Sequence, residues 1–247
     1  MWKSTAGAIV LALSIFSPTP GNAETKPTVV ELFTSQGCYS CPAAEAFLGK
    51  LADRKDLIAL EFHVDYWDEL VYGLAGKWKD PFSSPENTER QRAYNVNIRR
   101  QSGVYTPQMV IGGRYEAVGS RRDAVYAAIR RADAEKSTAL DIKIERRGDR
   151  GLRIGIGGND PRPATVWLVR FDHAHTTLVK SGENKGKTLT SRNIVRAARK
   201  IGVWTGRRRQ IDLEEIKLAE NQGCAVLVQG SAPRWPGPVL GGQLCPK

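Results

Sequence analysis

Two apolar runs with a helical segment between them most constrain the fold of this chain. Residues 28 to 33 (TVVELF) and 57 to 64 (LIALEFHV) are rich in β-branched and aromatic side chains. Such runs are typical of strands buried on both faces inside a parallel sheet. Residues 42 to 52 between them have helical spacing. Because such crossovers are right-handed, the sequence predicts a βαβ unit with two parallel strands.

More elements of the same kind follow, up to about residue 134. They are a helix that begins at Pro85 behind the N-cap residue Ser84, strands over 108–111 and 115–118 joined by Gly112-Gly113, and a helix opened by residues 120 to 123 (SRRD), which resemble a capping box. The first half of the chain therefore predicts an α/β domain.

The first 23 residues have the layout of a cleavable secretory signal. Lys3 precedes an apolar run over residues 6 to 16, and the small-residue ending Gly21-Asn22-Ala23 follows a Pro/Gly break. The sequence holds no later apolar stretch of about 20 residues, so we expect no membrane span. We expect a secreted, periplasmic protein in an oxidising environment, where disulfides persist.

Charge divides the chain into two parts. The formal net charge is +11, from 37 Lys and Arg against 26 Asp and Glu. Residues 24 to 136 are balanced, and the excess positive charge of the mature chain lies in residues 137 to 247. The hydrophobic periodicity changes at the same place. We therefore predict a domain over residues 24–136 and a second, basic domain over residues 137–247, with the boundary near Ser137.

The second part consists of short alternating runs separated by Gly and Pro, which favour an all-β sandwich. Residues 192 to 200 also fit helical spacing, but we expect a strand there. The expected strands cover residues 140–144, 152–156, 165–171, 176–180, 194–204, 210–213, 224–229 and 239–244.

Cys38 and Cys41 form a CxxC pair between the first predicted strand and helix. Unpaired N–H groups and the helix dipole at a helix N-terminus favour a thiolate and lower the pKa of a cysteine. We expect Cys38 to be the nucleophile and Cys41 to resolve the mixed disulfide. Pro42 leaves two starts for the helix, directly after Cys38 or at Pro42 itself.

Metal binding is the main chemical alternative for this pair. A structural zinc site needs four ligands, and the sequence contains no second CxxC or histidine pair at matching spacing. We expect no metal and no cofactor. Two thiolates also suit Cu(I), so a Cu(I)-handling module, or a binding module without redox turnover, remains an alternative to thiol-disulfide exchange.

Six segments resemble a known family: VVELFTSQGCYSCPAAEAFL, FHVDYWD, KDPF, RQRAYN, VYTPQMVIGG and GENKGKTL. They are similar to exported, mostly bacterial thioredoxin-like proteins catalogued as domain of unknown function 1223. That family has no settled activity. The resemblance implies a thioredoxin-like fold for the first part and a site at the CxxC, but no substrate. The predicted fold is thus a thioredoxin-like α/β domain followed by an all-β sandwich.

The resemblance also implies roles for three further residues. Thioredoxin-like proteins carry a cis-proline facing the CxxC, and Thr106-Pro107 stands at that point, where the loop would pair with the substrate backbone. They also hold a buried acid in the first strand as a proton acceptor for the resolving thiol. Glu31 is either this acid or a structural acid bonded to the backbone or to a cation.

Cys224 and Cys245 are expected to form a structural disulfide in the second part. The expected function is that of an exported thiol-disulfide oxidoreductase acting on a protein or a small thiol or disulfide. The basic second part suits an anionic envelope partner, with a solvated basic face as the alternative. Nucleic acid is not expected as a partner after export.

Overall fold

The computed structural model describes residues 26–70, 76–135, 140–158, 162–230 and 236–246. The predicted signal sequence and the boundary expected near Ser137 lie outside these residues. Of the helices in the described ranges, none is long and apolar enough to cross a membrane. The elements are β1 (Thr28–Thr34), α1 (Pro42–Ala52), β2 (Leu57–His63), α2 (Pro85–Tyr94), the π-helix η2 (Asn95–Arg99), β3 (Gln108–Ile111), β4 (Tyr115–Val118), α3 (Arg122–Ala134), β5 (Asp141–Arg147), β6 (Gly151–Gly157), β7 (Ala164–Leu178), β8 (Thr188–Trp204), β9 (Arg209–Leu213), β10 (Gln222–Gly230) and β11 (Val239–Leu244).

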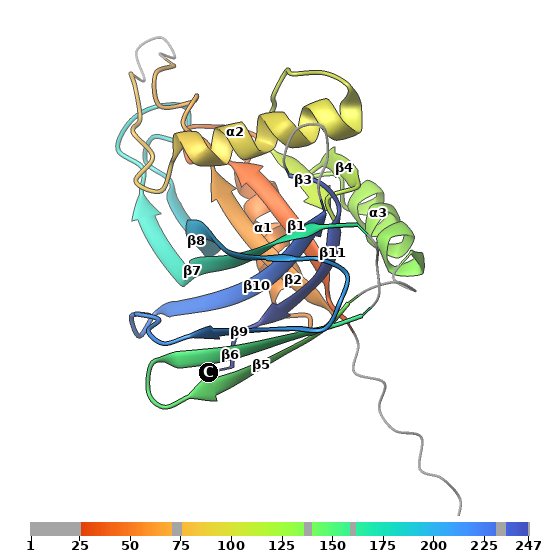
Figure 1. The fold of residues 1–247 in the computed structure, drawn as a ribbon. Helices are drawn as coiled ribbons and strands as arrows, with labels where there is room; N and C mark the ends of the chain where they lie inside the picture. Colours follow the sequence, from red (N-terminus) through yellow and green to blue (C-terminus); the bar gives the residue numbers. More distant parts are fainter. Residues whose placement is uncertain (1–25, 71–75, 136–139, 159–161, 231–235, 247) are drawn as a thin grey trace, which may run out of the picture.

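Eight strands form one mixed sheet in the order β11-β10-β7-β8-β2-β1-β3-β4, and β5, β6 and β9 form a second sheet. β1 runs parallel to β2 and antiparallel to β3. Figure 1 shows α2 across the ends of β1 and β2, and the three-stranded sheet next to β10 and β11. The predicted βαβ unit is confirmed.

The prediction of a thioredoxin-like domain followed by a separate β-sandwich is wrong. Strands from the second half of the chain continue the sheet begun by the first half, because β8 pairs in parallel with β2 at Ile194 and Glu61. Two more bonds strengthen this junction: Asn193 Nδ2 donates to the Ala59 carbonyl (2.9 Å), and the Arg192 N–H donates to Glu61 Oε2 (3.1 Å). The edge of β2 would otherwise present unpaired backbone groups. The fold is a single mixed α/β arrangement around a shared sheet.

The hydrophobic cores show the same continuity. One core lies between the sheet and the helices α1 and α3. On the opposite face of β1 and β2, Val29 and Ile58 share a second core with Phe171 and Leu227 from the C-terminal strands. The sheet curves back on itself, since the Val239 N–H donates to the Gly112 carbonyl (2.9 Å) and joins β11 to the β3–β4 turn. A third core lies between the C-terminal strands and the small sheet.

Local signals in the sequence were mostly accurate. Ser84 caps α2 by accepting a hydrogen bond from the Asn87 N–H (3.3 Å), and Gly112 and Gly113 turn the hairpin with φ of 59° and 63°. The expected strand over residues 194–204 is confirmed as part of β8, while the two expected strands over 165–180 are merged in β7. The capping box at α3 is wrong: Arg121 precedes the helix and makes no side-chain cap.

Glu31 forms a buried ion pair with Arg90 of α2. Arg90 donates from Nε to Glu31 Oε2 (2.6 Å) and from Nη2 to Oε1 (3.0 Å), and Tyr94 donates its hydroxyl to Oε1 (2.7 Å). Gln229 of β10 accepts from Arg90 (3.2 Å) and donates to the Tyr94 oxygen (2.7 Å). Burial acts to lower the pKa of Arg90, but Glu31 and Tyr94 raise it. Glu31 therefore has the contacts of a structural acid bonded to a cation.

We predict that Glu31→Gln lowers the free energy of unfolding by about 3–5 kcal/mol, because it leaves the Arg90 charge buried without its counter-ion. Denaturant unfolding measures the loss. The double variant Glu31→Leu/Arg90→Leu should recover much of it, since no lone charge remains. Arg54→Ala is the control: it breaks an exposed pair with Asp56 and should cost about 1 kcal/mol or less. A similar small loss for Glu31→Gln would contradict a structural role for this pair.

A disulfide joins Cys224 of β10 to Cys245, directly after β11, with a Cα–Cα distance of 5.3 Å. The Cys245 N–H also donates to the Cys224 carbonyl (2.8 Å). The bond closes a loop over a sequence separation of 21 residues.

We predict that Cys224→Ala/Cys245→Ala costs about 3 kcal/mol of stability, from the entropy that the cross-link removes from the unfolded chain. Thermal and denaturant unfolding measure it, while alkylation of Cys38 after reduction should keep its wild-type rate. A changed Cys38 rate would show that this bond does more than stabilise the fold.

Candidate functional site

Cys38 and Cys41 form a disulfide at the N-terminus of α1, with a Cα–Cα distance of 5.4 Å. Cys41 is the N-cap residue and the helix begins at Pro42, which is one of the two starts that the sequence left open. The Cys41 carbonyl accepts from the N–H groups of Ala44 (2.9 Å) and Glu45 (3.1 Å). Both cysteines are completely buried. The dipole of α1 therefore points its positive end at this pair.

A tight turn connects β1 to the pair. The Cys38 N–H donates to the Ser35 carbonyl (3.1 Å), and Gly37 N–H donates to Ser35 Oγ (3.1 Å). Ser40 Oγ lies 3.5 Å from Cys38 Sγ. Tyr39, between the cysteines, is 67% exposed. The turn thus holds the sulfurs inside and presents one aromatic ring to solvent.

Thr106-Pro107 lies beside this turn. Its peptide bond is cis. In the antiparallel pairing of β1 with β3, Phe33 lies opposite Gln108. Pro107, the residue before Gln108, therefore lies next to the end of β1. Trp67 links the two loops, because its Nε1 donates to Thr106 Oγ1 (2.8 Å) and its Cβ packs against Gly37. The structure therefore brings Cys38, Cys41 and the Thr106-Pro107 loop to one edge of the sheet.

Glu31 does not belong to this group. Val30 and Leu32 point toward α1, whereas their neighbours Val29 and Phe33 line the core on the other face. Because successive side chains of a strand alternate between faces, Glu31 points away from α1. The sheet separates Glu31 from the face on which α1 packs.

A cluster of buried titratable side chains, which the sequence pattern does not predict, lies on the face of the sheet that α1 covers. It consists of Glu61, His63 and Asp80. Glu61 and His63 follow Leu57 and Ala59 on that side of β2. His63 Nδ1 contacts Asp80 Oδ2 (2.7 Å) and its Nε2 contacts Glu61 Oε1 (2.8 Å). Asp80 also accepts from the Gln36 N–H (2.7 Å), which connects this cluster to the CxxC turn.

The charges of this cluster follow from its contacts. Burial acts to lower the pKa of His63, but Asp80 and Glu61 raise it well above its usual value. Burial acts to raise the pKa of Asp80, but His63 and the backbone N–H groups of Gln36 and Phe82 hold it below its usual value. His63 is therefore a buried cation held between two acidic side chains.

Glu45 of α1 completes the acidic set. Its Oε1 accepts from Thr34 Oγ1 (2.7 Å), while its Oε2 is buried and has no hydrogen-bond partner among the described residues. Burial, and then the carboxyl group of Glu61, raise the pKa of Glu45 to about 8. Glu45 stands four residues after Cys41, on the same face of the helix. This acid, one helical turn after the second cysteine, can exchange a proton near neutral pH.

One sequence signal pointed to Glu45. The helix buries Ala44, Leu48 and Leu51 on its inner face, and Glu45 falls within that apolar stripe. An acid in the first turn also suits the helix dipole, so the position had an ordinary explanation. Glu61 and His63 lie on the same strand, but Asp80 comes from a segment 17 residues after His63, and only the fold brings it to them.

The loop between β7 and β8 covers the other side of the CxxC turn. Asn184 is completely buried, and its Nδ2 donates to the carbonyls of Gln36 (2.8 Å) and Cys38 (2.9 Å). Glu183 Oε2 accepts from the Tyr39 N–H (2.8 Å). These residues belong to the GENKGKTL segment, to which the sequence assigned no role.

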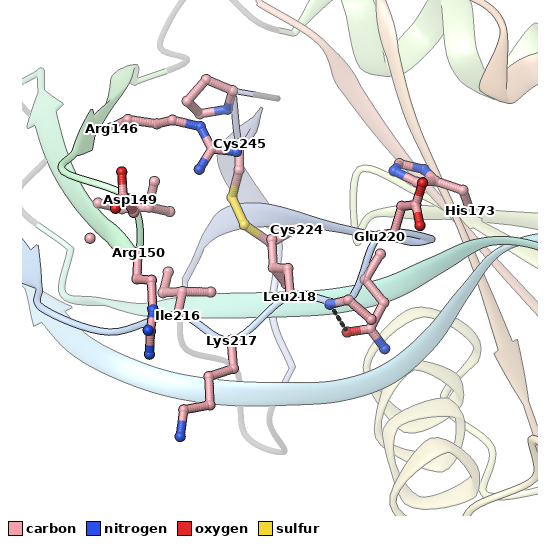
Figure 2. A pocket seen from close by; sticks show the side chains of 15 residues that line it. Arg146, Asp149, Arg150, His173, Ile216, Lys217, Leu218, Glu220, Cys224 and Cys245 are labelled. Atoms are coloured by element: carbon pink, nitrogen blue, oxygen red, sulfur yellow. Dashed lines mark hydrogen bonds between the residues drawn. A yellow bond between two sulfur atoms is a disulfide. The ribbon is translucent and has the colours of Figure 1, made fainter.

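A separate groove of about 650 Å³ lies beside the second disulfide (Figure 2). Its cations are already engaged, since Arg150 and Lys217 both contact Glu215 Oε1 at 3.0 and 3.5 Å. No residue of the CxxC turn lines this groove, so the groove is not part of the site around Cys38 and Cys41. We take the CxxC pair at the N-terminus of α1 as the candidate site. The groove is lined by residues that include Arg146, Arg150, His173, Lys217, Cys224 and Cys245.

Comparisons with known proteins identify the family of the chain. The chain is similar to a protein from Agrobacterium tumefaciens whose X-ray crystal structure came from a structural genomics consortium: the two are 32% identical, with a TM-score of 0.73, over 88% of this chain and 93% of the other. No curated protein matches the chain. Residues 29–229 match the model of a family described as protein of unknown function (DUF1223). The chain therefore belongs to the DUF1223 family.

Proposed function

We propose that this protein exchanges thiols and disulfides through Cys38 and Cys41. The observation that carries the proposal is the position of the pair: it lies at the N-terminus of α1, one turn from a buried carboxyl group, one oxygen of which has no hydrogen-bond partner in the described part of the chain. A helix N-terminus favours the thiolate, which is the attacking form, and the carboxyl group offers a place for the proton of the second thiol.

The reaction begins with the reduced pair. The Cys38 thiolate attacks one sulfur of a substrate disulfide, a bond forms between them, and the other substrate sulfur leaves as a thiolate. The Cys41 thiolate then attacks Cys38 Sγ and releases the second substrate sulfur. The substrate disulfide is reduced and the protein pair is oxidised. Substrate oxidation is the reverse of these steps.

Glu45 supports the second step. The Cys41 thiol must lose its proton before it attacks the mixed disulfide, and the ionised Glu45 carboxylate accepts that proton. In the reverse direction, protonated Glu45 returns it to the leaving Cys41 thiolate. The pKa of about 8 suits both transfers near neutral pH.

The context of the reaction is also part of the proposal. Two disulfides in one chain fit an oxidising compartment, and residues 1–23 would direct export to it. The substrate would be a protein or a small thiol or disulfide. The excess of basic residues after residue 137 would favour an anionic partner in the cell envelope.

We predict that Cys41→Ser, expressed in the exporting compartment, accumulates covalent complexes through Cys38, because the mixed disulfide forms and is not resolved. Non-reducing electrophoresis and mass spectrometry of the captured species measure this. Cys38→Ser is the matched control and should capture nothing.

Absence of complexes with Cys41→Ser would contradict exchange. In that case, copper retained through purification by the wild type and lost in Cys38→Ser would support the Cu(I)-handling alternative.

We predict that Glu45→Gln slows resolution of a mixed disulfide on Cys38 about 10²-fold, because the general base is lost. In the wild type the rate should rise with pH and level off above about pH 8, as Glu45 ionises. Glu45→Gln should lose that inflection. Stopped-flow measurement of substrate release across pH gives both results.

Thr34→Val is the control for this assignment. The Thr34 hydroxyl lowers the pKa of Glu45, so its removal should move the inflection to higher pH while keeping resolution active. An unchanged pH profile in both variants would exclude Glu45 as the proton acceptor.

A further inference from the structure

Both sulfurs of the CxxC pair are inaccessible in this structure. Cys38 and Cys41 have no exposed surface, although Tyr39 between them is 67% exposed. Exchange requires a second sulfur to approach along the bond that breaks. A segment next to Cys38 must therefore move before any substrate reacts.

The peptide group between Cys38 and Tyr39 is held at both ends by adjacent residues of one loop. Its carbonyl oxygen accepts from Asn184 Nδ2 (2.9 Å), and its N–H donates to Glu183 Oε2 (2.8 Å). Asn184 also donates to the Gln36 carbonyl (2.8 Å), so one amide group bridges two carbonyls of the turn. These bonds fix the orientation of the turn that carries Cys38.

The loop itself has its own supports. Asn184 Oδ1 accepts from Lys187 Nζ (2.9 Å), and this ammonium group lies 4.4 Å from the centre of the Tyr39 ring. Ser181 Oγ donates to the Lys77 carbonyl, and Gly182 packs against Trp78. The loop thus packs against the segment before Asp80 and contacts the CxxC turn.

We propose that Glu183 and Asn184 are positioning residues that control access to Cys38: release of the Cys38–Tyr39 peptide from these two side chains exposes the sulfur to substrate. This inference rests on the proposed exchange function and adds its controlling step. Release also makes the Tyr39 N–H available, which in the closed turn is bonded to a carboxylate. A backbone N–H near the nucleophile stabilises a thiolate. Opening therefore couples access with reactivity.

The test is the rate at which dithiothreitol reduces the Cys38–Cys41 disulfide in the full chain, followed by alkylation and peptide mass spectrometry. Asn184→Ala removes both donors, so the closed turn loses stability and reduction should become about tenfold faster. Glu183→Gln keeps the side-chain shape and weakens one acceptor, so we expect about a threefold increase. Glu183→Gln provides the test of the reduction rate if Asn184→Ala fails to fold.

Asn97→Ala is the matched control. Asn97 Nδ2 also bonds a distant carbonyl, that of Pro236 (2.9 Å), but lies outside the CxxC turn. The Asn97→Ala variant should have a lower melting temperature and an unchanged rate of reduction of the Cys38–Cys41 disulfide. Equal rates for the wild type, Asn184→Ala and Glu183→Gln would overturn the proposal, as would an equal acceleration in Asn97→Ala, which would indicate general loosening.

Chemical reduction needs no natural substrate, so the result separates this inference from the proposed function. If Cys41→Ser captures no substrate while Asn184→Ala still reacts faster, the exchange function fails and control of access stands. If Cys41→Ser captures substrates and Asn184→Ala reacts like the wild type, exchange stands and the positioning role fails.

Discussion

The buried contact between Glu31 and Arg90 is the interaction on which the rest of the structure depends. A charged pair without solvent is stable only where further hydrogen bonds satisfy it. Here Tyr94 from α2 and Gln229 from β10 supply them. One network therefore ties the first strand, the helix across the strand ends and a strand from the far part of the chain. The two halves of the sequence meet at this point, on the face of the sheet where they also share a hydrophobic core.

Successive side chains of β1 point to opposite faces of the sheet, and the two faces carry acids with different roles. On one face, Glu31 is neutralised by a permanent cation and holds the structure together. On the other face, Thr34 contacts Glu45, whose raised pKa of about 8 leaves it able to change charge. His63, paired with Asp80 and Glu61, is a buried cation close to Glu45 and limits the rise of that pKa. A shift of one residue in the register of β1 would move Glu31 to the α1 face and Thr34 to the opposite face.

The sequence predicted what depends on local pattern. The order of the elements up to α3, the Ser84 cap and the Gly112-Gly113 turn follow from hydrophobic period, capping chemistry and backbone freedom, which act within a few residues. The position of Cys38 and Cys41 before a helix is equally local.

Other features depend on pairs distant in sequence. The junction of β2 with β8, the approach of Asp80 to His63 and the contact of Asn184 with Cys38 arise only from tertiary packing. Nothing in the short runs distinguishes strands that extend an existing sheet from strands that form a separate sandwich. Glu31 illustrates the same limit, because its partner Arg90 lies 59 residues away.

The location of the Asn184 loop has a consequence for how the chain is made. Asn184 is separated from Cys38 by 146 positions, and the strands that carry its loop join β2 at the pairing of Glu61 with Ile194. Long-range pairing of this kind is slow compared with the formation of a local turn and helix. During synthesis, the residues of the CxxC turn and α1 therefore emerge before the residues that cover them. The nascent chain passes through a stage with uncovered, oxidisable thiols, and the arrival of the C-terminal strands ends it.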